Sequence, residues 1–231
     1  MPSRVVLYFV TMDMENQIAD PAFIAGVVVA AGVRAGPAAP ELERELGELV
    51  LLRSTEEFPP PDVKEAIRKL LKKGGFKPSG RNKPASEYLA QAAREGRFPR
   101  INNLVDINNL LSLETGLPIS LLDRAAFSGR ASLRYGLPGE KYVFNNAGQE
   151  IDLSGLICVC SGPGAPLGNP VKDSMAGKLK AETESVLGVI YASRDCEAGR
   201  NIAAHARRFA ELLQKFGGAK EAQNFVVGRQ T

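Results

Sequence analysis

The sequence has no hydrophobic run long enough to cross a membrane. The longest apolar stretch, around residues 22–33, is shorter than the roughly 20 residues that a membrane-spanning helix needs. No basic region leads into an apolar segment at the N-terminus, as it would in a secretion signal. We therefore expect a cytoplasmic protein with no membrane partner.

Cysteine and histidine are both scarce. The chain has three cysteines, and the single residue between Cys158 and Cys160 fits neither a disulfide framework nor a zinc knuckle. Alternate residues of a strand share a face, so buried thiols are the better interpretation. His205 is the one histidine and would have to serve alone in a metal site or a Ser-His-Asp triad. We expect no metal, and we do not favour a catalytic role for His205.

The glycine-rich segments lack the spacing of nucleotide-binding motifs. No glycine precedes Gly177 at the distance a P-loop requires, and Leu179 stands where that motif has Ser or Thr. Residues 162–168 do not satisfy G-x-G-x-x-G. We therefore expect no nucleotide cofactor, although residues 168–178 combine glycines with Lys172, Asp173 and Ser174 and could cradle a phosphate.

Charge is unevenly distributed along the chain. The formal net charge is only +3, but residues 64–100 hold eleven basic residues against three acids. Such a local excess is typical of a surface that binds a polyanion. A solvated helix face followed by a basic loop would give the same pattern, and the composition alone does not separate the two.

Apolar periodicity predicts one domain, residues 1–231, that mixes helices and strands. With 44% hydrophobic residues, the chain can bury a substantial core. Runs of β-branched and apolar residues predict strands at 4–11, 23–33 and 186–192, the second of them buried on both faces. Apolar residues at helical spacing predict helices at 41–52, 62–73, 86–94, 102–115 and 197–216.

Residues 131–160 have the pattern of a β-meander. Tight-turn sequences separate short strands at 132–135, 142–144, 150–153 and 156–160. Two other segments are rich in turn residues: 76–84 predicts an exposed loop, and 161–168 a glycine-proline loop.

Two polar groups fall inside the apolar arc of the predicted helix at 102–115. At 100° per residue, Asn108 and Ser112 lie between Leu104 and Val105. A buried polar group without a partner costs roughly 1 to 3 kcal/mol. Asn108 and Ser112 therefore either pin a neighbouring loop or bind a ligand.

An arginine and a glutamate lie close to one predicted turn. Arg134 is on the incoming strand, and Gly139 and Glu140 form the turn. The pair could be a surface salt bridge worth little to stability, or it could orient the ammonium and carboxylate of a ligand.

Residues 104–123 contain several motifs that occur together in a known family. The run Leu104-Val-Asp-Ile-Asn-Asn-Leu-Leu-Ser-Leu-Glu114-Thr-Gly116-Leu-Pro118-Ile-Ser120-Leu-Leu-Asp123 resembles the pattern V-V-D-V-T-N-Y-V-x-x-E-x-G-Q-P-x-H-A-F-D of the phenylalanyl-tRNA synthetase β subunit, in its editing, tRNA-binding module. The residues in register are Asp106, Asn109, Glu114, Gly116, Pro118 and Asp123. The basic loop and the sequence Phe98-Pro-Arg-Ile-Asn-Asn resemble freestanding versions of the module, and the likeness covers residues 76–192.

The resemblance implies an α/β (α+β) fold, a single globular module with a central, mostly antiparallel β core flanked by helices. It also implies a pocket for an amino acid esterified to the 3′ end of tRNA. In the synthetase, that pocket hydrolyses tyrosine wrongly attached to phenylalanine tRNA. The synthetase's catalytic core is absent from this sequence, so the resemblance implies editing in trans without charging of tRNA.

Three positions depart from the family pattern. Asn108 replaces a threonine, Ser120 replaces a histidine, and the editing glutamate of the late strand falls at Val189 or Tyr191. An ester beside a ribose hydroxyl is already activated, so hydrogen-bond donors that position a water molecule can suffice for hydrolysis.

The resemblance, together with the local patterns, assigns three sets of site residues. Residues expected to position the attacking water are Asn108, Ser112, Ser120 and Glu140. Residues expected to hold the amino acid or the terminal nucleotide are Asn109, Arg134, Gly139, Asp173 and Ser174. Residues expected to hold phosphates are Lys77, Arg81, Lys83 and Lys172.

Three functions are consistent with these assignments. The first is a deacylase that hydrolyses mischarged aminoacyl-tRNA in trans. The second is a binding module that recognises tRNA, other RNA or a free amino acid without catalysis. The third is a plain amino-acid-binding or amino-acid-modifying protein, which would need the pocket but not the basic surface.

Overall fold

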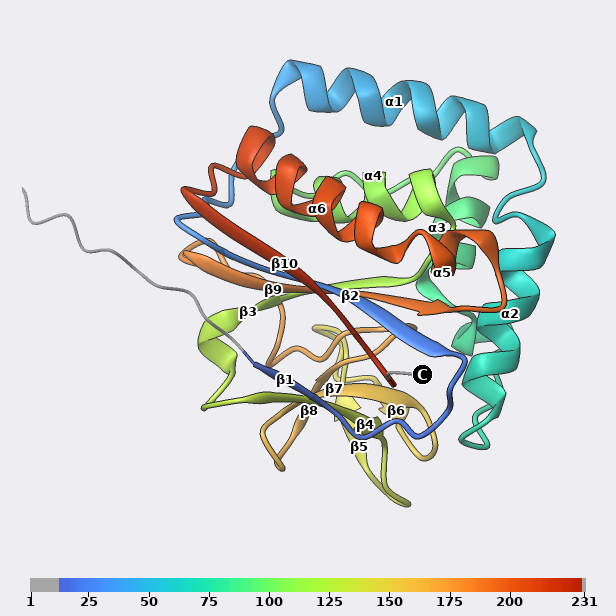
Figure 1. The fold of residues 1–231 in the computed structure, drawn as a ribbon. Coiled ribbons are helices and arrows are strands. Elements are labelled where there is room, and N and C mark those ends of the chain that lie inside the picture. The colour runs from blue at the N-terminus through green and yellow to red at the C-terminus, as the bar shows by residue number, and fades with distance from the viewer. Residues whose placement is uncertain (1–12, 230–231) are drawn as a thin grey trace, which may run out of the picture.

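The protein is built around a central antiparallel sheet that joins distant parts of the chain. The computed structural model describes residues 13–229. The strand order of this sheet is β10, β2, β9 and β3, and every neighbouring pair is antiparallel. Its strands are β2 (Phe23–Ala31), β3 (Ile119–Asp123), β9 (Ser185–Ser193) and β10 (Glu221–Gly228). Because β10 pairs with β2, segments from the two ends of the chain lie side by side (Figure 1).

A second sheet lies under one face of the central sheet (Figure 1). Its strands, in spatial order, are β1 (Met14–Asn16), β4 (Ala131–Tyr135), β7 (Ile157–Ser161) and β8 (Pro166–Gly168). The pair β1–β4 is parallel and the other pairs are antiparallel. The predicted α/β class with a mostly antiparallel core is confirmed.

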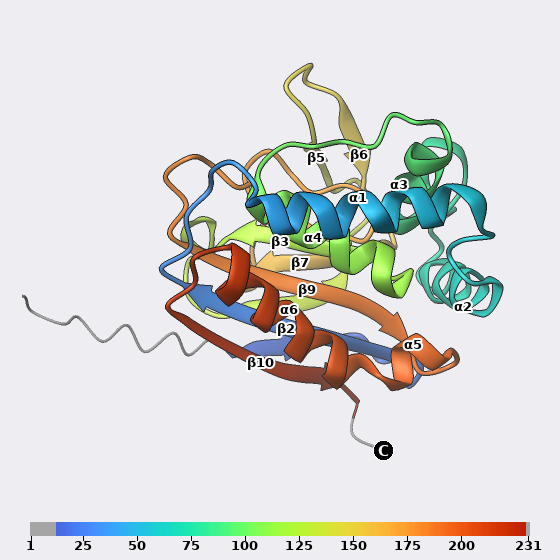
Figure 2. The same ribbon diagram turned by 90° about the horizontal axis from the view of Figure 1, so that it is seen from above.

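Helices lie over the other face of the central sheet, with α2 beside the end of the sheet (Figure 1). They are α1 (Pro40–Thr55), α2 (Pro61–Lys72), α3 (Ala85–Arg94), α4 (Asn103–Thr115), α5 (Glu197–Arg200) and α6 (Ile202–Phe216). Helices α4 and α6 lie next to the sheet, and α1 lies over them on the outside (Figures 1 and 2). Within residues 13–229, no helix is long and apolar enough to cross a membrane.

Strand β2 shows why the apolar run forms the centre of the core. All nine of its residues are buried. The sheet leaves little room above it, because a Cβ on Gly26 would lie 3.1 Å from Ile202 of α6. The prediction that this strand is buried on both faces is confirmed.

The predicted meander is wrong. Strand β4 pairs directly with β7, while β5 (Lys141–Val143) and β6 (Glu150–Asp152) form a separate hairpin between them in sequence. Figure 2 shows this hairpin extending beyond the two sheets. The sequence predicts the tight turns correctly. It does not show that β4 pairs with β7 and not with β5, the strand that follows it in sequence.

The predicted helix at 197–216 is two helices, broken at Asn201. The first turn, α5, stays against the end of β9, because Gly199 approaches Ser193 so closely that a Cβ would lie 1.8 Å from the Ser193 carbonyl oxygen. The inward face predicted for the rest of the helix is confirmed by burial of Ile202, Phe209 and Phe216, among others.

The other predicted elements are mostly in place. Helices α1 to α4 confirm the first four predicted helices, and β9 confirms the late strand. The end of the predicted loop at 161–168 is strand β8. The strand predicted for residues 4–11 lies outside the described residues.

Candidate functional site

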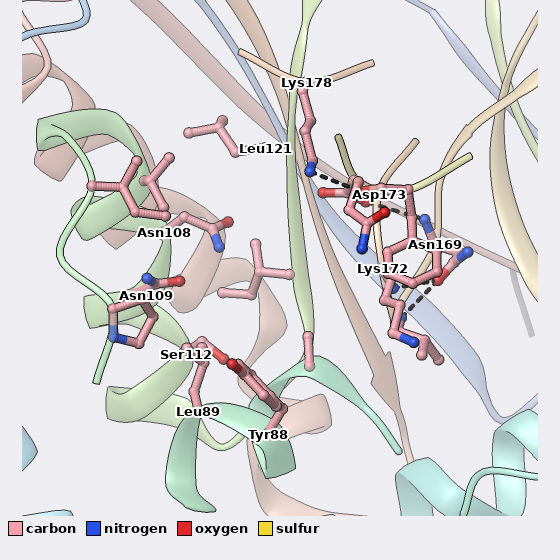
Figure 3. A pocket seen from close by; sticks show the side chains of 18 of the residues that line it. Tyr88, Leu89, Asn108, Asn109, Ser112, Leu121, Asn169, Lys172, Asp173 and Lys178 are labelled. Carbon is pink, nitrogen blue, oxygen red and sulfur yellow. Dashed lines mark hydrogen bonds between the residues drawn. The ribbon is translucent and has the colours of Figure 1, made fainter. Parts of the chain in front are cut away.

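A cavity of about 1010 Å³ opens where the helices meet the edge of the central sheet. Helices α3 and α4 form one side, the edge strand β3 forms the floor, and residues 169–173 form the other side. Figure 3 shows polar side chains facing each other from the two sides, with Leu121 of β3 between them. The cavity therefore has two polar walls and an apolar floor.

Helix α4 supplies the first polar wall through Asn108, Asn109 and Ser112. Asn108 and Ser112 are four residues apart, so they lie on the same face of the helix. The Ser112 hydroxyl donates to the Leu117 carbonyl at 2.8 Å. With its proton used in this way, Ser112 Oγ can only accept a hydrogen bond from a ligand.

Asn108 differs from Ser112 because its side-chain oxygen accepts no hydrogen bond within residues 13–229. This oxygen, Oδ1, is buried. An unsatisfied buried acceptor costs about 1 to 3 kcal/mol. The sequence predicts that Asn108 and Ser112 either hold a neighbouring loop in place or face a ligand, and the two residues differ in outcome. Ser112 holds the turn after α4, while the Asn108 acceptor is unpaired at the cavity within residues 13–229.

The floor of the cavity is apolar. Leu89 of α3, Val105 of α4, and Ile119 and Leu121 of β3 line it. A ligand side chain lying on this floor would have to be desolvated, and only an apolar one gains free energy on that transfer.

The second polar wall comes from the segment after β8. Asn169 Oδ1 accepts hydrogen bonds from the N–H groups of Val171 and Lys172, both at 2.8 Å. Its amide nitrogen donates to the hydroxyl of Tyr142, which in turn donates to the Lys172 carbonyl at 2.6 Å. These bonds fix the turn that brings Lys172 and Asp173 to the cavity (Figure 3).

Asp173 belongs to a hydrogen-bond network that continues beneath the floor. Ser120 Oγ lies 2.6 Å from Asp173 Oδ1 and 2.9 Å from the Tyr191 hydroxyl. The Asn169 N–H donates to the same Asp173 oxygen at 3.2 Å. Ser120 can also donate to the Asn169 carbonyl, at 3.3 Å, so the network can satisfy Asp173 in either protonation state.

Burial raises the pKa of Asp173 to about 7. The hydrogen bonds from Ser120 and Asn169 and the charge of Lys178 oppose this rise but do not cancel it. A carboxyl group with a pKa near neutrality can exchange a proton at physiological pH. Asp173 thus lines the cavity as a carboxyl group whose pKa burial has raised.

Cations surround the mouth of the cavity. Arg81, Lys83, Arg97, Lys172 and Lys178 all line it. The β5–β6 hairpin holds two of them: Lys178 Nζ donates to the Phe144 carbonyl at 2.7 Å, and Lys172 Nζ lies 4.2 Å from the centroid of the Phe144 ring. Burial and the charge of Arg81 lower the pKa of Lys172.

Arg134, Gly139 and Glu140 do not line the cavity. Arg134 and Glu140 instead form a two-point ion pair, with both N–O distances 2.7 Å. Glu140 also accepts from the Leu137 N–H at 2.6 Å, and the hydrogen bond from Arg134 holds the pKa of its carboxyl below the usual range. Of the two expectations for this pair, the structural one accounts for its contacts.

Three further expected site residues lie outside the cavity lining. Ser120 is fully buried below the floor and reaches the cavity only through Asp173. Ser174 is buried, and its Oγ accepts from the Gly177 N–H at 2.9 Å. Lys77 is exposed in the loop before α3. The sequence placed these residues near the site but could not show which side chains face it.

The structure adds residues that the sequence analysis did not assign to the site. Tyr88 and Arg97 meet at the mouth, where the guanidinium lies 5.6 Å from the ring centroid. Asn169 and Lys178 line the cavity from residues 168–178, a segment that the sequence marks as a loop able to cradle a phosphate without assigning these two residues. Tyr191 lies below the cavity, and its hydroxyl reaches that of Ser120 because β3 and β9 pair, a contact that only the tertiary register produces.

Most of the motif residues in register support the fold. Glu114 pairs with Arg208 of α6 at 2.9 Å. Asp123 accepts from the Thr183 hydroxyl at 2.8 Å, and Asp106 accepts from the Ile101 N–H at 3.3 Å. Gly116 ends α4 with a φ of 75°, a conformation that favours glycine. Among the six, Asn109 lines the cavity.

The cysteines and the histidine lie away from the cavity. Cys158, Cys160 and Cys196 are buried free thiols, and burial raises the pKa of Cys160 to about 11. His205 is on α6, and burial lowers its pKa. No group of three or more His, Cys, Asp or Glu residues that could hold a metal occurs within residues 13–229. The prediction of buried thiols is confirmed.

The fold and the cavity define a mixed α/β module with a ligand-sized hollow beside its central sheet. A sequence model of the B3/4 domain matches residues 75–210. The chain belongs to the B3/4 domain family. The resemblance predicted for residues 76–192 is thus confirmed, and the family match extends through β9 into α6.

Comparisons with curated proteins and with solved structures give less information than the family model. Among curated proteins, none matches the chain. Among solved structures, it is similar to the crystal structure of an N-terminal fragment of the phenylalanyl-tRNA synthetase β subunit from Pyrococcus horikoshii, with a TM-score of 0.49 and 8% sequence identity. The alignment covers 95% of this chain and 55% of that one, so the chain spans about half the length of the structure it matches.

Proposed function

We propose that the cavity binds the aminoacyl ester at the 3′ end of tRNA and that the protein hydrolyses it in trans, in the cytoplasm. The observation that carries the proposal is the combination in one cavity of an apolar floor, the unpaired acceptor of Asn108 and a cationic mouth. An aminoacyl-tRNA end has a side chain, an ammonium and phosphates that match these three features.

Helix α4 supports binding of the amino acid's ammonium group. Asn108 Oδ1 is unpaired within residues 13–229, and the Ser112 proton is already donated to Leu117. Both atoms therefore accept hydrogen bonds, and an ammonium is a donor only. The amino acid's side chain then lies on Leu89 and Leu121, which favours an apolar amino acid.

Asp173 supports the hydrolytic step. Its carboxylate takes a proton from a water molecule as the water oxygen attacks the ester carbonyl carbon. The bond from the carbonyl carbon to the ribose oxygen then breaks, and the proton passes to that oxygen. The products are a free amino acid and a tRNA with its ribose hydroxyl restored.

Ser120 acts on this step through Asp173. Because it lies below the floor, its part is to orient the carboxylate at 2.6 Å and not to contact the substrate. Asn109 and Asn169 line the same cavity and are positioned to hold the terminal nucleotide, while Arg81, Lys83 and Lys172 at the mouth hold its phosphates.

Deacylation of charged and mischarged tRNAs tests the proposal. Purified protein is incubated with a panel of aminoacyl-tRNAs, and release of each amino acid is followed against the uncatalysed rate. We expect release of one apolar amino acid or a small group of them. Asp173→Asn should reduce the rate constant by about 100-fold or more, the usual contribution of a general base.

A matched control is Asp152→Asn, which removes a carboxylate on the β5–β6 hairpin outside the cavity lining. This variant should deacylate at the wild-type rate. Equal rates for wild type and Asp173→Asn on every charged tRNA would contradict the assignment of Asp173.

A second candidate function is binding without catalysis. It is favoured by the positions at which the family pattern has its histidine and its glutamate. These are Ser120 for the histidine and Val189 or Tyr191 for the glutamate; all three side chains are buried, and none lines the cavity. Under this candidate, tRNA binds in a salt-dependent manner and no charged tRNA in the panel is deacylated. Binding of a free amino acid with no dependence on Arg81, Lys83 and Lys172 would instead indicate a plain amino-acid-binding protein.

A further inference from the structure

Two smaller hollows adjoin the cavity on the side of α2 and α3. The first, here called the connecting hollow, has a volume of about 130 Å³ and shares Gly80, Lys83 and Gln91 with the cavity. The second, the α2 hollow, has a volume of about 660 Å³ and shares Lys64 and Arg68 with the connecting hollow. Together the two hollows lead from the mouth of the cavity onto the outer face of α2, and we call them the cation groove.

The cation groove is strongly positive. Helix α2 lines it with Lys64, Arg68, Lys69 and Lys72, and the next residue, Lys73, also lines it. Lys83 and Arg94 add two more cations in the connecting hollow. The carboxylates in its lining are Glu57, Glu65 and Glu87. Cations thus outnumber carboxylates by seven to three in a surface that adjoins the cationic mouth of the cavity.

The cations form a regular row along the helix. Lys64, Arg68 and Lys72 are spaced four residues apart, so they share one face and recur about every 6 Å. A nucleic-acid backbone presents its phosphates at regular short intervals in the same way. A row of this kind can contact several phosphates of one strand.

Internal ion pairs neutralise only part of this charge. Arg68 pairs with Glu87 at 2.6 Å, Lys69 with Asp195 at 3.2 Å, and Lys73 with Asp20 at 3.7 Å. Within residues 13–229, Lys64 and Lys72 have no carboxylate oxygen within 4 Å. These two cations remain available to an external anion.

The surface lacks what a membrane site would need. Every large apolar side chain of α2, namely Val63, Ile67, Leu70 and Leu71, is buried. A helix that inserts into a lipid surface exposes an apolar face beside its cations. The groove therefore suits a polar polyanion and not a lipid surface.

We propose that the cation groove binds the phosphodiester backbone of the tRNA acceptor strand as the strand leaves the cavity. This proposal rests on the proposed function, because that function puts the 3′ end in the cavity. Nucleic acid then contacts the protein at two places: the terminal nucleotide at the cavity and the following phosphates on α2.

The test compares two ligands with one triple variant. The ligands are an RNA hairpin that reproduces an acceptor stem with a single-stranded CCA end, and adenosine carrying an amide-linked phenylalanyl group at the 3′ position. The variant is Lys64→Gln, Lys69→Gln and Lys72→Gln combined. Fluorescence anisotropy gives the dissociation constant of the hairpin across a salt series, and calorimetry gives that of the small analogue.

For the hairpin, we expect the triple variant to bind at least about tenfold more weakly at low salt. The slope of log K against log salt should fall by about 2 to 3, close to one for each lost phosphate contact. Binding of the small analogue should not change, because it does not extend beyond the cavity. A matched control replaces three exposed cations elsewhere, Arg130, Arg207 and Lys220, by glutamine and should bind the hairpin like the wild type.

The outcomes separate the two proposals. If the analogue binds but the hairpin binds equally well to wild type and triple variant, the groove proposal is overturned and the proposed function stands. If wild type binds neither ligand, both fail. If wild type ignores the hairpin but binds vesicles containing phosphatidylserine, and the triple variant does not, the groove is a lipid-binding surface and the proposal is again overturned.

Discussion

At the residue scale, the burial of a polar group at Asn108 and at Asp173 lowers the stability of the ligand-free protein. Asn108 has a buried oxygen without a partner within residues 13–229, and Asp173 is a carboxyl group whose burial raises its pKa to about 7. Polar groups that a fold buries at a cost are typical of binding and catalytic sites.

Replacing Asn108 should therefore change stability and binding in opposite directions. Asn108→Leu keeps the size of the side chain and removes the unpaired acceptor, so we expect the free energy of unfolding to rise by about 1 kcal/mol. Binding of an amide-linked aminoacyl-adenosine should weaken about tenfold, because the ammonium loses an acceptor. Urea denaturation and calorimetry measure the two effects. A loss of stability equal to the loss of binding energy would mean that Asn108 is a structural residue.

Asp173 should make stability fall as the pH rises. Its pKa is about 7 in the folded protein and about 3.9 in the unfolded chain. Between these values the folded state retains a proton that the unfolded state has lost, so wild type loses stability from about pH 4 to 7. Asp173→Asn lacks this loss, and its Tm minus that of wild type should be more positive at pH 8 than at pH 5.

The control for this pH dependence is Asp152→Asn. A hydrogen bond from Ser154 lowers the pKa of Asp152, so its contribution to stability is present above its unfolded pKa and lost as the pH falls. Its Tm difference from wild type should not become more positive with rising pH. If Asp173→Asn and Asp152→Asn respond alike, Asp173 is not a proton-holding group near neutrality.

At the element scale, the turn between α4 and β3 sets the position of the cavity wall. The hydroxyls of Ser112 and Thr115 donate to backbone carbonyls of Leu117 and Leu111 at 2.8 Å each. Gly116 then turns the chain with a φ of 75°. The cavity wall on α4 and the floor on β3 are thus joined by a turn whose geometry the sequence fixes locally.

Gly116→Ala should destabilise this turn. The positive φ costs an alanine free energy, and its Cβ would lie 3.0 Å from Pro59. We expect a loss of about 1 to 3 kcal/mol, seen as a lower Tm. Gly148→Ala is the control, since Gly148 has a similar φ of 73° but nothing within 4 Å of its Cβ. An equal loss in both variants would mean that the contact with Pro59 is unimportant.

The β4–β5 turn is a separate element whose charges hold it together. Glu140→Gln removes the negative charge from the ion pair between Glu140 and Arg134. The Glu140 side chain is 24% exposed and the Arg134 side chain 12% exposed. We expect a loss of about 1 to 2 kcal/mol in stability and an unchanged affinity for the aminoacyl-adenosine analogue. Weaker binding with unchanged stability would restore Glu140 to the ligand site.

At the scale of the whole molecule, the family match does not by itself contain a complete core. The match covers residues 75–210, yet β2 lies between β9 and β10 in the central sheet and precedes the matched region. Without β2, β9 would lose a paired neighbour along its whole length. The segments outside the match are therefore part of the same core.

A fragment of residues 75–210 should not fold alone. It would expose the edge of β9 and the apolar face of α6 that covers β2, which favours aggregation. The full chain should unfold in one cooperative transition, and the fragment should lack one. Circular dichroism during heating measures both. A cooperative transition in the fragment would contradict this view of the core.

Local patterns predicted most helices and the buried strand, because helical periodicity and apolar runs are properties of neighbouring residues. They also placed Asn108, Ser112, Lys172 and Asp173, which line the cavity. The pairing of β4 with β7 and the contact between Ser120 and Tyr191 arise from the tertiary register of strands far apart in sequence. No local signal carries that information, which is why the sequence does not predict that Tyr191 contacts Ser120 or that Arg134 and Glu140 lie outside the cavity lining.

The most direct test of the central claim is a calorimetric titration with amide-linked 3′-aminoacyl-adenosines that cannot be hydrolysed, carrying alanyl, leucyl and phenylalanyl groups. We expect at least one to bind wild type, to bind Asn108→Leu about tenfold more weakly, and to bind Glu140→Gln as it binds wild type. Binding of equal strength to all three proteins, or to none of them, would contradict the claim that this cavity holds the aminoacyl end of tRNA.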